Sequence, residues 1–115
     1  MKDLESGRRW RTWLLAIVVL VGGAWSASAW AAPATHTIII EGTRFTPETL
    51  VVHRGDRVVW ANKDPFPHTA TASTGAFDSK SIGANRSWTY VANKSGTFDY
   101  GCTFHVTMKG RLIVE

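Results

Sequence analysis

The chain has 115 residues, which is enough for one domain of ordinary size, and its formal net charge is +4. Four of the thirteen basic residues lie in the first eleven positions, so residues 32–115 keep nine Lys/Arg against seven Asp/Glu, a net charge of +2. Nucleic-acid binding needs a concentrated basic face, which this balance does not provide. We therefore expect no nucleic-acid partner.

The N-terminal segment has the three parts of a secretory signal peptide. Basic residues come first, an uncharged apolar run follows, and Ala29-Trp30-Ala31 forms a small-residue exit. We therefore expect residues 1–31 to be a cleaved signal peptide, residues 32–115 to be the mature domain, and the location to be periplasmic. An uncleaved membrane anchor is the alternative, because the twenty residues 13–32 are long enough to span a bilayer. The pair Arg8-Arg9 leaves both general and twin-arginine export open.

After residue 32, short β-branched and apolar runs alternate with Gly, Pro and Asn turns. No window there has a helical period, and the segment 74–85 is expected to be a loop. In the run 97–102, the alternation of side chains places Phe98, Tyr100 and Cys102 on one face. Cys102 is therefore expected at the end of its strand, where the chain leaves the sheet. The spacing of the runs predicts an all-β sandwich. The seven expected strands are 35–40, 49–53, 57–62, 68–73, 86–91, 97–102 and 110–115.

The chain has a single cysteine, Cys102, and His105 and Met108 follow it at steps of three residues. Exported proteins normally pair their cysteines, so a single one indicates an intermolecular bridge, a reactive thiol or a metal ligand. His68 supplies a fourth donor, and two nearby prolines stiffen the chain before it. Two imidazoles, one thiolate and a weak thioether are the donors of a blue-copper site, whereas zinc sites rarely recruit methionine. The pattern predicts one type 1 copper ion.

The other two histidines are not accompanied by further metal-binding residues in the sequence. His36 lies in the first expected strand, and His53 ends a strand just before the Arg54-Gly55-Asp56 turn. Neither has a second donor nearby in sequence, so we expect both to be exposed and neither to bind the metal.

With these residues in place, the sequence from 35 to 115 resembles the cupredoxins, and within them the amicyanin, plastocyanin and pseudoazurin group. The resemblance implies a Greek-key β-sandwich with copper bound at one pole. It implies His68, Cys102 and His105 as equatorial ligands and Met108 as the axial one, in proteins that carry single electrons between larger redox proteins. Because all four positions would then be protein side chains, no position is left for a substrate, and we expect the protein not to be an enzyme. The motifs that carry it are Phe45-Thr46-Pro47, Gly55-Asp56-Arg57-Val58-Val59-Trp60-Ala61-Asn62, Pro67-His68, Gly96-Thr97-Phe98, Tyr100-Gly101-Cys102 and Gly110-Arg111-Leu112-Ile113-Val114.

The chain departs from its relatives beside the ligands. Many relatives have Asn after the first ligand histidine, where it ties two ligand loops together, and this chain has Thr69, whose hydroxyl replaces part of that link. The backbone N–H of Thr69 is expected to reach the sulfur of Cys102. Asn62 is expected either to bond across to the ligand loop or to be an ordinary turn residue. Phe104 and Val106 stand where amicyanin-like loops often carry prolines.

The expected function is single-electron transfer between redox partner proteins that dock near His105, where Phe66, Phe104 and Val106 form an apolar patch. A copper carrier or copper-homeostasis protein is the alternative, although such proteins use several Met and His and this chain has only two methionines. A fragment of a copper enzyme would need further copper sites and a longer chain. We expect a monomer that meets a membrane only if its N-terminal segment is retained.

Overall fold

The computed structural model describes residues 22–23 and 32–115, so the expected signal peptide lies outside the described residues except at Gly22 and Gly23. In the described part, every regular element is a strand, and no helix there is long and apolar enough to cross a membrane. The strands are β1 (Thr35–Ile40), β2 (Phe45–Thr46), β3 (Thr49–Val52), β4 (Arg57–Asn62), β5 (Thr71–Ala72), β6 (Ser87–Val91), β7 (Gly96–Gly101) and β8 (Lys109–Val114).

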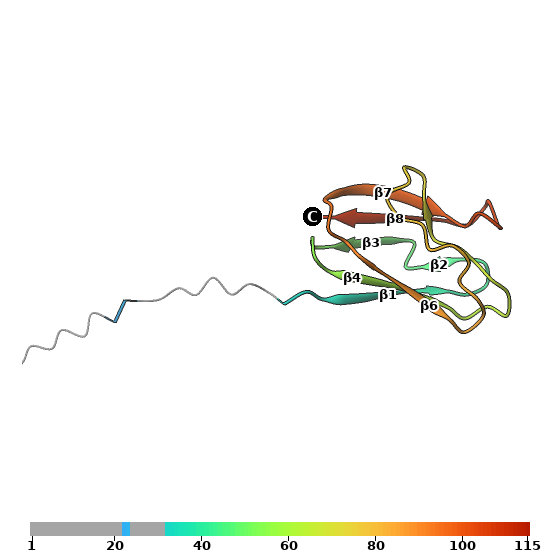
Figure 1. Cartoon of the computed structure of the whole chain (residues 1–115), viewed down its shortest axis with the longest axis horizontal. Coiled ribbons are helices and arrows are strands. Elements are labelled where there is room, and N and C mark those ends of the chain that lie inside the picture. Colours follow the sequence, from blue (N-terminus) through green and yellow to red (C-terminus); the bar gives the residue numbers. More distant parts are fainter. Residues whose placement is uncertain (1–21, 24–31) are drawn as a thin grey trace, which may run out of the picture. The chain divides into compact units, whose positions relative to one another are not determined.

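The eight strands form two four-stranded sheets that pack face to face (Figure 1). One sheet has the order β2-β1-β4-β6 and the other the order β3-β8-β7-β5. The chain changes sheet repeatedly, so β1 lies parallel to β4 and β3 lies parallel to β8, whereas the other neighbours are antiparallel. The prediction of an all-β Greek-key sandwich is confirmed.

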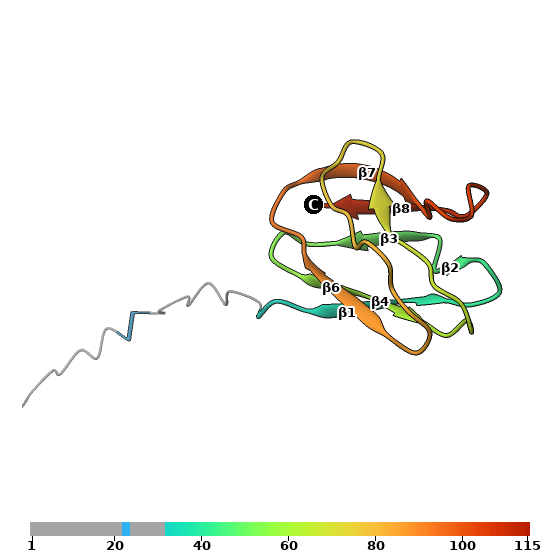
Figure 2. The same cartoon turned by 45° about the vertical axis from the view of Figure 1, so that its right-hand side comes forward.

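The sandwich has two ends with different contents. The loop pole is formed by the β1–β2 turn, the segment 63–70 and the loop 102–108. The terminal pole is formed by Ala34, residues 53–56 and Glu115, joined by a hydrogen bond from the Arg54 N–H to the Glu115 carbonyl of 2.9 Å. In both views the loop between β7 and β8 projects from the end opposite the C-terminus (Figures 1 and 2).

The core between the sheets is strongly aromatic. The fully buried Trp60 of β4 has its ring centroid 5.4 Å from those of Phe77 and Tyr100. Phe77 and Ile82 come from the segment between β5 and β6, so a stretch expected only to be loop also supplies buried side chains. Gly110 is required beside this cluster, because a Cβ there would overlap the ring of Tyr100.

Most predicted strands match the observed ones within one or two residues. The exception is the run 68–73, of which only Thr71–Ala72 pairs with β7, while His68 and Thr71 make isolated bridges to Ile82 and Asp78. The short strand β2 was not predicted. The face shared by Phe98, Tyr100 and Cys102 is confirmed, since all three are buried.

Candidate metal centre

His68 is held in a fixed place at the loop pole. Its backbone exchanges two hydrogen bonds with Ile82: its N–H donates to the Ile82 carbonyl at 3.1 Å, and its own carbonyl accepts from the Ile82 N–H at 2.7 Å. Its side chain is fully buried. The ring turns Nδ1 toward Cys102, at 3.8 Å from Sγ.

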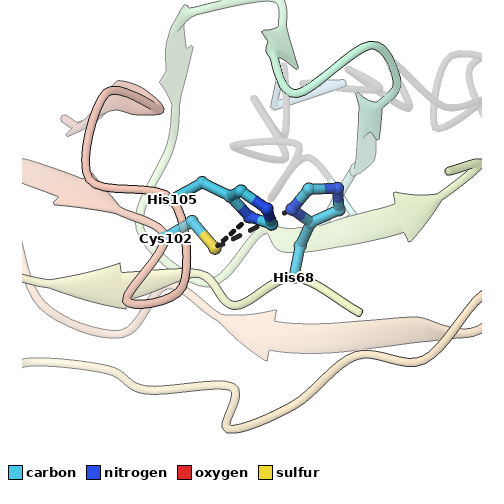
Figure 3. Close-up of side chains that lie close together, drawn as sticks. All are labelled: His68, Cys102 and His105. Carbon is cyan, nitrogen blue, oxygen red and sulfur yellow. Dashed lines mark hydrogen bonds between the residues drawn. The ribbon is translucent and has the colours of Figure 1, made fainter. Parts of the chain in front are cut away.

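Cys102 and His105 reach the same point from the end of β7. Cys102 is the first residue after β7, and its buried Sγ lies 3.7 Å from Nδ1 of the half-buried His105. The donor atoms of His68, Cys102 and His105 all lie within 4.8 Å of one another. Figure 3 shows the three side chains converging, with His68 facing the other two. The structure thus brings together three of the four predicted ligands.

The spacing of these donors fits a bound metal ion. With a metal–sulfur bond of about 2.3 Å and a metal–nitrogen bond of about 2.0 Å, donors about 120° apart are separated by roughly 3.7 Å. The two sulfur–nitrogen separations of 3.8 Å and 3.7 Å agree with that value. The donor types, two imidazole nitrogens and one thiol sulfur, suit copper better than magnesium or calcium, which prefer oxygen.

Met108 closes the loop that carries two of these residues. Its N–H donates to the His105 carbonyl at 3.0 Å, and its own carbonyl accepts the Cys102 N–H at 3.4 Å. Its side chain is buried in the same core cluster as Cys102. These two backbone hydrogen bonds fold residues 102–108 into a compact loop. The assignment of Met108 as the axial ligand stays a prediction.

Thr69 joins the two segments that carry the ligands. Its N–H donates to the Cys102 sulfur at 3.3 Å, as predicted. Its hydroxyl oxygen accepts the Thr103 N–H at 2.9 Å and the Thr71 hydroxyl at 3.0 Å. The hydroxyl therefore ties the two ligand segments together, which is the role expected of it in place of Asn. Hydrogen bonds to a ligand sulfur and around it tune a metal site.

Asn62 differs from both of its predicted roles. It is buried, and its Nδ2 donates to the carbonyls of Phe66 and Ile82 at 2.9 Å each. It thus supports the segment that leads to His68, not the loop 102–108. Its Oδ1 also accepts the Asp64 N–H at 2.9 Å.

Asp64 is the residue at this site that the sequence did not reveal. It is buried, and its Oδ2 lies 2.7 Å from Nε2 of His68, on the side of the ring away from Cys102. Burial acts to raise the pKa of Asp64, but the N–H groups of Thr43 and Gly42, together with His68, hold that pKa below its usual value. The sequence offers only the spacing Asp-x-x-x-His in "DPFPH", and in an irregular segment this spacing does not predict a contact.

The two remaining histidines lie at the terminal pole, away from the three donors. His53 is exposed, as expected, with 79% of its side chain accessible. The expectation of an exposed His36 is wrong, because its Nε2 bonds to Oδ2 of the buried Asp56 at 2.9 Å and its side chain is only 28% accessible. The cluster of donors at the loop pole includes neither of them, and that neither binds the metal stays a prediction.

Three apolar side chains that are close in sequence to the ligand histidines are exposed. Phe66, Phe104 and Val106 are exposed by 41%, 55% and 79% respectively. The ring centroid of Phe66 lies 5.1 Å from that of His68 and 5.7 Å from that of His105. We call these three residues the His105 rim; their exposure is what the predicted apolar patch requires, and the patch itself stays a prediction.

Comparisons with known proteins agree with this geometry. A family described as the cupredoxin-like domain matches residues 13–114. Amicyanin-alpha of Methylorubrum extorquens is 29% identical over 105 residues, which cover 87% of this chain and 88% of that protein. The Cu(I) form of an amicyanin with one methionine replaced by alanine is 26% identical, with a TM-score of 0.67 over 76% of this chain and 88% of that one. A Cu-containing nitrite reductase of Thermus scotoductus is 25% identical, with a TM-score of 0.66 over 73% of this chain but only 22% of that one.

Proposed function

Because the chain belongs to the cupredoxin-like family, we propose that it is an exported electron-transfer protein with His68, Cys102 and His105 as equatorial copper ligands and Met108 as the axial ligand. The family and the donor set confirm the coarser predictions, a small type 1 copper protein with one copper ion. The observation that carries the proposal is the convergence of one buried thiol and two imidazole nitrogens within 4.8 Å.

Copper in such a site supplies a centre that gains and loses one electron. The protein's part is to hold the donors still and to keep water away. His68 and Cys102 are buried, and Thr69 bonds to the sulfur and to the following loop. Rigid donors keep the same arrangement in both oxidation states, which favours fast electron transfer. With all four positions taken by protein side chains, no position is left for a substrate, so we propose a carrier and not an enzyme.

His105 is the ligand through which we propose that the electron passes to a partner protein. It is the half-buried member of the three donors; the exposed Phe104 and Val106 flank it in the sequence, and the ring centroid of Phe66 lies 5.7 Å from its own. Transient redox complexes use small interfaces, for which a compact apolar patch is sufficient. We propose that redox partner proteins dock there, on a monomeric carrier.

The beginning of the folded domain supports the proposed cleavage of residues 1–31. The N–H of Ala34 donates to Asp56 Oδ1 at 3.0 Å, and its carbonyl accepts the Arg57 N–H at 2.8 Å. The domain is thus tied into its fold from Ala34 onward, and a cut after Ala31 would leave every one of these bonds in place. The intact mass of the protein exported to a bacterial periplasm tests this. A mature chain beginning near Ala32 is expected, and a membrane-bound full-length chain would contradict it.

Voltammetry of the copper-loaded protein tests electron transfer itself. A single reversible one-electron wave is expected, with one copper per chain. An irreversible wave with easy loss of copper would favour a copper carrier, and more than one copper per chain would favour a fragment of a copper enzyme.

A pair of matched variants tests the docking surface. Phe104→Glu places a charge on the His105 rim, and we expect it to slow electron transfer to a partner by about tenfold or more, because a charge in an apolar contact must lose its water. Val91→Glu is the control, since Val91 is an exposed apolar residue of β6 that pairs with Arg57 near the terminal pole. Equal rates for Phe104→Glu and the unaltered protein would show that partners dock elsewhere.

A further inference from the structure

We propose that the half-buried Trp88 is a second electron exit, which serves small anionic one-electron oxidants and is connected to Cys102 through Trp60 and Tyr100. The basis is a row of packed aromatic side chains that begins beside the cysteine and ends on β6, a strand that contributes no residue to the His105 rim. The proposal rests on the proposed function in one respect, because it takes copper as the source of the electron.

The row begins on the strand that carries the thiol. Tyr100 lies two residues before Cys102 on the same buried face, so their Cα atoms are about 6.6 Å apart. The ring centroid of Tyr100 lies 5.4 Å from that of Trp60, which comes from β4 in the other sheet. Aromatic centroids about 4.5–7 Å apart belong to rings in contact. Packed atoms therefore lead from the strand of Cys102 to Trp60.

The row continues to the edge of the second sheet. Trp60 and Trp88 are directly paired between β4 and β6, and their ring centroids lie 5.5 Å apart. Trp88 in turn stacks on Tyr90, with centroids 5.9 Å apart and 16° between the ring planes. Strand β6 is the last of its sheet, and Trp88 is half-buried where Trp60 is fully buried. Trp88 is therefore the tryptophan of the pair that a solute can reach.

Trp60 and Trp88 differ in where the proton of an oxidised indole can go. An indole that loses an electron becomes a stronger acid and passes its N–H proton to a base or to water. Within the described part of the chain, neither Nε1 of Trp60 nor the hydroxyl of Tyr100 makes a hydrogen bond, and both atoms are buried. Trp88 is partly open to water. The electron vacancy therefore settles on Trp88, and Trp60 only passes the electron on.

A cleft beside Trp88 gives small solutes access to the indole. Its volume is about 360 Å³, at the small end of the range for ligand sites. The indole shares it with the exposed Arg86 and with three serines, Ser79, Ser81 and Ser87. Hydroxyl groups and a guanidinium donate hydrogen bonds to anions. The cleft therefore suits a small anionic oxidant, for which the carbonate radical anion is the probe.

The proposed reaction balances in electrons and protons. The carbonate radical anion takes one electron from Trp88 and becomes carbonate, and the indole releases its N–H proton to water. One electron then returns from Cu(I) through Trp60, and the indole of Trp88 takes a proton back from water. The net change is the transfer of one electron from Cu(I) to the radical, which leaves Cu(II), carbonate and an unaltered Trp88.

The first measurement uses the reduced, copper-loaded mature protein, because Trp60 and Trp88 are the only tryptophans of residues 32–115. A light pulse generates the carbonate radical anion, and transient absorption follows the tryptophan radical and the blue band of Cu(II). We expect the radical to decay at the rate at which the blue band grows, independently of protein concentration, and to persist for longer in the metal-free protein. A decay that becomes faster with protein concentration, or one that is not matched by the blue band, would overturn the proposal.

This measurement separates the two ways of failing. A protein that does not turn blue with Cu(II) fails the proposed function before any light pulse is given. A blue protein whose tryptophan radical decays no faster with Cu(I) than without metal fails this proposal alone. Peptide mass spectrometry gives a second readout: oxidation products at Trp88 should be fewer in the Cu(I) protein than in the metal-free protein, and equal damage would contradict the proposal.

Three variants assign the parts of the row. Trp88→Phe removes the accessible indole, so the tryptophan radical should be lost. Trp60→Phe keeps a ring but removes the oxidisable group, so the radical should persist as it does in the metal-free protein. Phe77→Leu is the matched control, because Phe77 packs 5.4 Å from Trp60 and 6.2 Å from Trp88 but is not oxidised in their place. This control should keep the linked decay.

The outcomes of the variants decide the role of each tryptophan. An undiminished radical yield in Trp88→Phe, or an unchanged linked decay in a folded Trp60→Phe protein, would overturn the proposal. Loss of the linked decay in Phe77→Leu as well would assign the effect to packing and overturn the role of Trp60. If Trp60→Phe does not fold, the concentration dependence in the unaltered protein decides.

Discussion

Strand β4 has a buried aspartate near each of its ends, and each aspartate bonds to a histidine. Asp56 pairs with His36 at the terminal pole, and Asp64 pairs with His68 at the loop pole. Each carboxylate also accepts two backbone N–H groups, so the two pairs tie loops to the sandwich in the same way.

The difference between the two pairs lies in what faces the other side of the imidazole. His68 is fully buried and its Nδ1 faces a thiol, whereas the side chain of His36 is 28% accessible. The cysteine that follows β7 and the loop after it place the metal centre at the loop pole.

The largest expected difference between the poles is the colour of the copper-loaded protein. Cys102→Ser should abolish the intense blue band, because that band arises from charge transfer between the thiolate and copper. His36→Ala at the terminal pole, and His53→Ala beside it, should keep the band at full intensity. Visible spectra of the three copper-loaded variants make the comparison, and loss of the blue band in either histidine variant would disprove the ligand assignment.

Met108→Leu tests whether Met108 is the axial ligand at the loop pole. The variant should stay blue, because the three equatorial donors are intact, and its reduction potential should rise, because a weak thioether donor favours Cu(II) more than an alkyl group does. Voltammetry measures the change. An unchanged potential would mean that Met108, which is buried in the core cluster, is only a packing residue.

Acid titration tests the structural role of the terminal pole. The bond to His36, with the N–H groups of His53 and Ala34, lowers the pKa of Asp56 from 3.8 to about 2. A lowered carboxyl pKa stabilises the fold above 3.8, and this stabilisation is lost as the pH falls toward about 2. Asp56→Asn should therefore lose less of its free energy of unfolding than the unaltered protein between about pH 5 and pH 2. Urea titrations of the metal-free proteins at a series of pH values measure it, and identical pH dependence would count against the pairing.

The smallest expected effect concerns the link between the ligand segments. Thr69→Val keeps the shape of the side chain but removes the acceptor of two hydrogen bonds, so the free energy of unfolding should fall by about 1–2 kcal/mol. Hydrogen exchange of the Thr103 amide, which donates to Thr69, should become faster. Thr89→Val on an exposed position of β6 is the control and should change stability by less than about 0.5 kcal/mol. Unchanged exchange at Thr103 would show that the link does not restrain the loop.

The long strands could be predicted because their signal is local. The β-branched run at β1 and the run at β4 give the observed bounds, since each is a continuous stretch of strand-forming residues with its buried positions close together in the sequence. The run 68–73 misled, because its threonines suit a strand but its backbone bonds to Ile82, Phe77 and Ser79 of the following loop. Strand β2 has two residues, too few for a period of two to be visible.

Part of the candidate site could also be predicted from residues that are close together in the sequence. Cys102, His105 and Met108 follow one another at fixed spacing, and Thr69 is the neighbour of His68. The roles of Asp64 and His36 depend on segments that only the fold brings together: the β1–β2 turn comes to Asp64, and the parallel pairing of β1 with β4 brings His36 to Asp56. A carboxylate four residues before a histidine in an irregular segment gives no signal in the sequence.

The most direct test of the central claim is a copper titration of the metal-free mature protein, followed by its visible absorption. We expect an intense blue band that grows in proportion to Cu(II), stops at one copper per chain and disappears when the protein is reduced. Saturation at one copper without a blue band, or a blue band that forms equally in Cys102→Ser, would contradict the assignment of His68, Cys102 and His105 as the copper ligands.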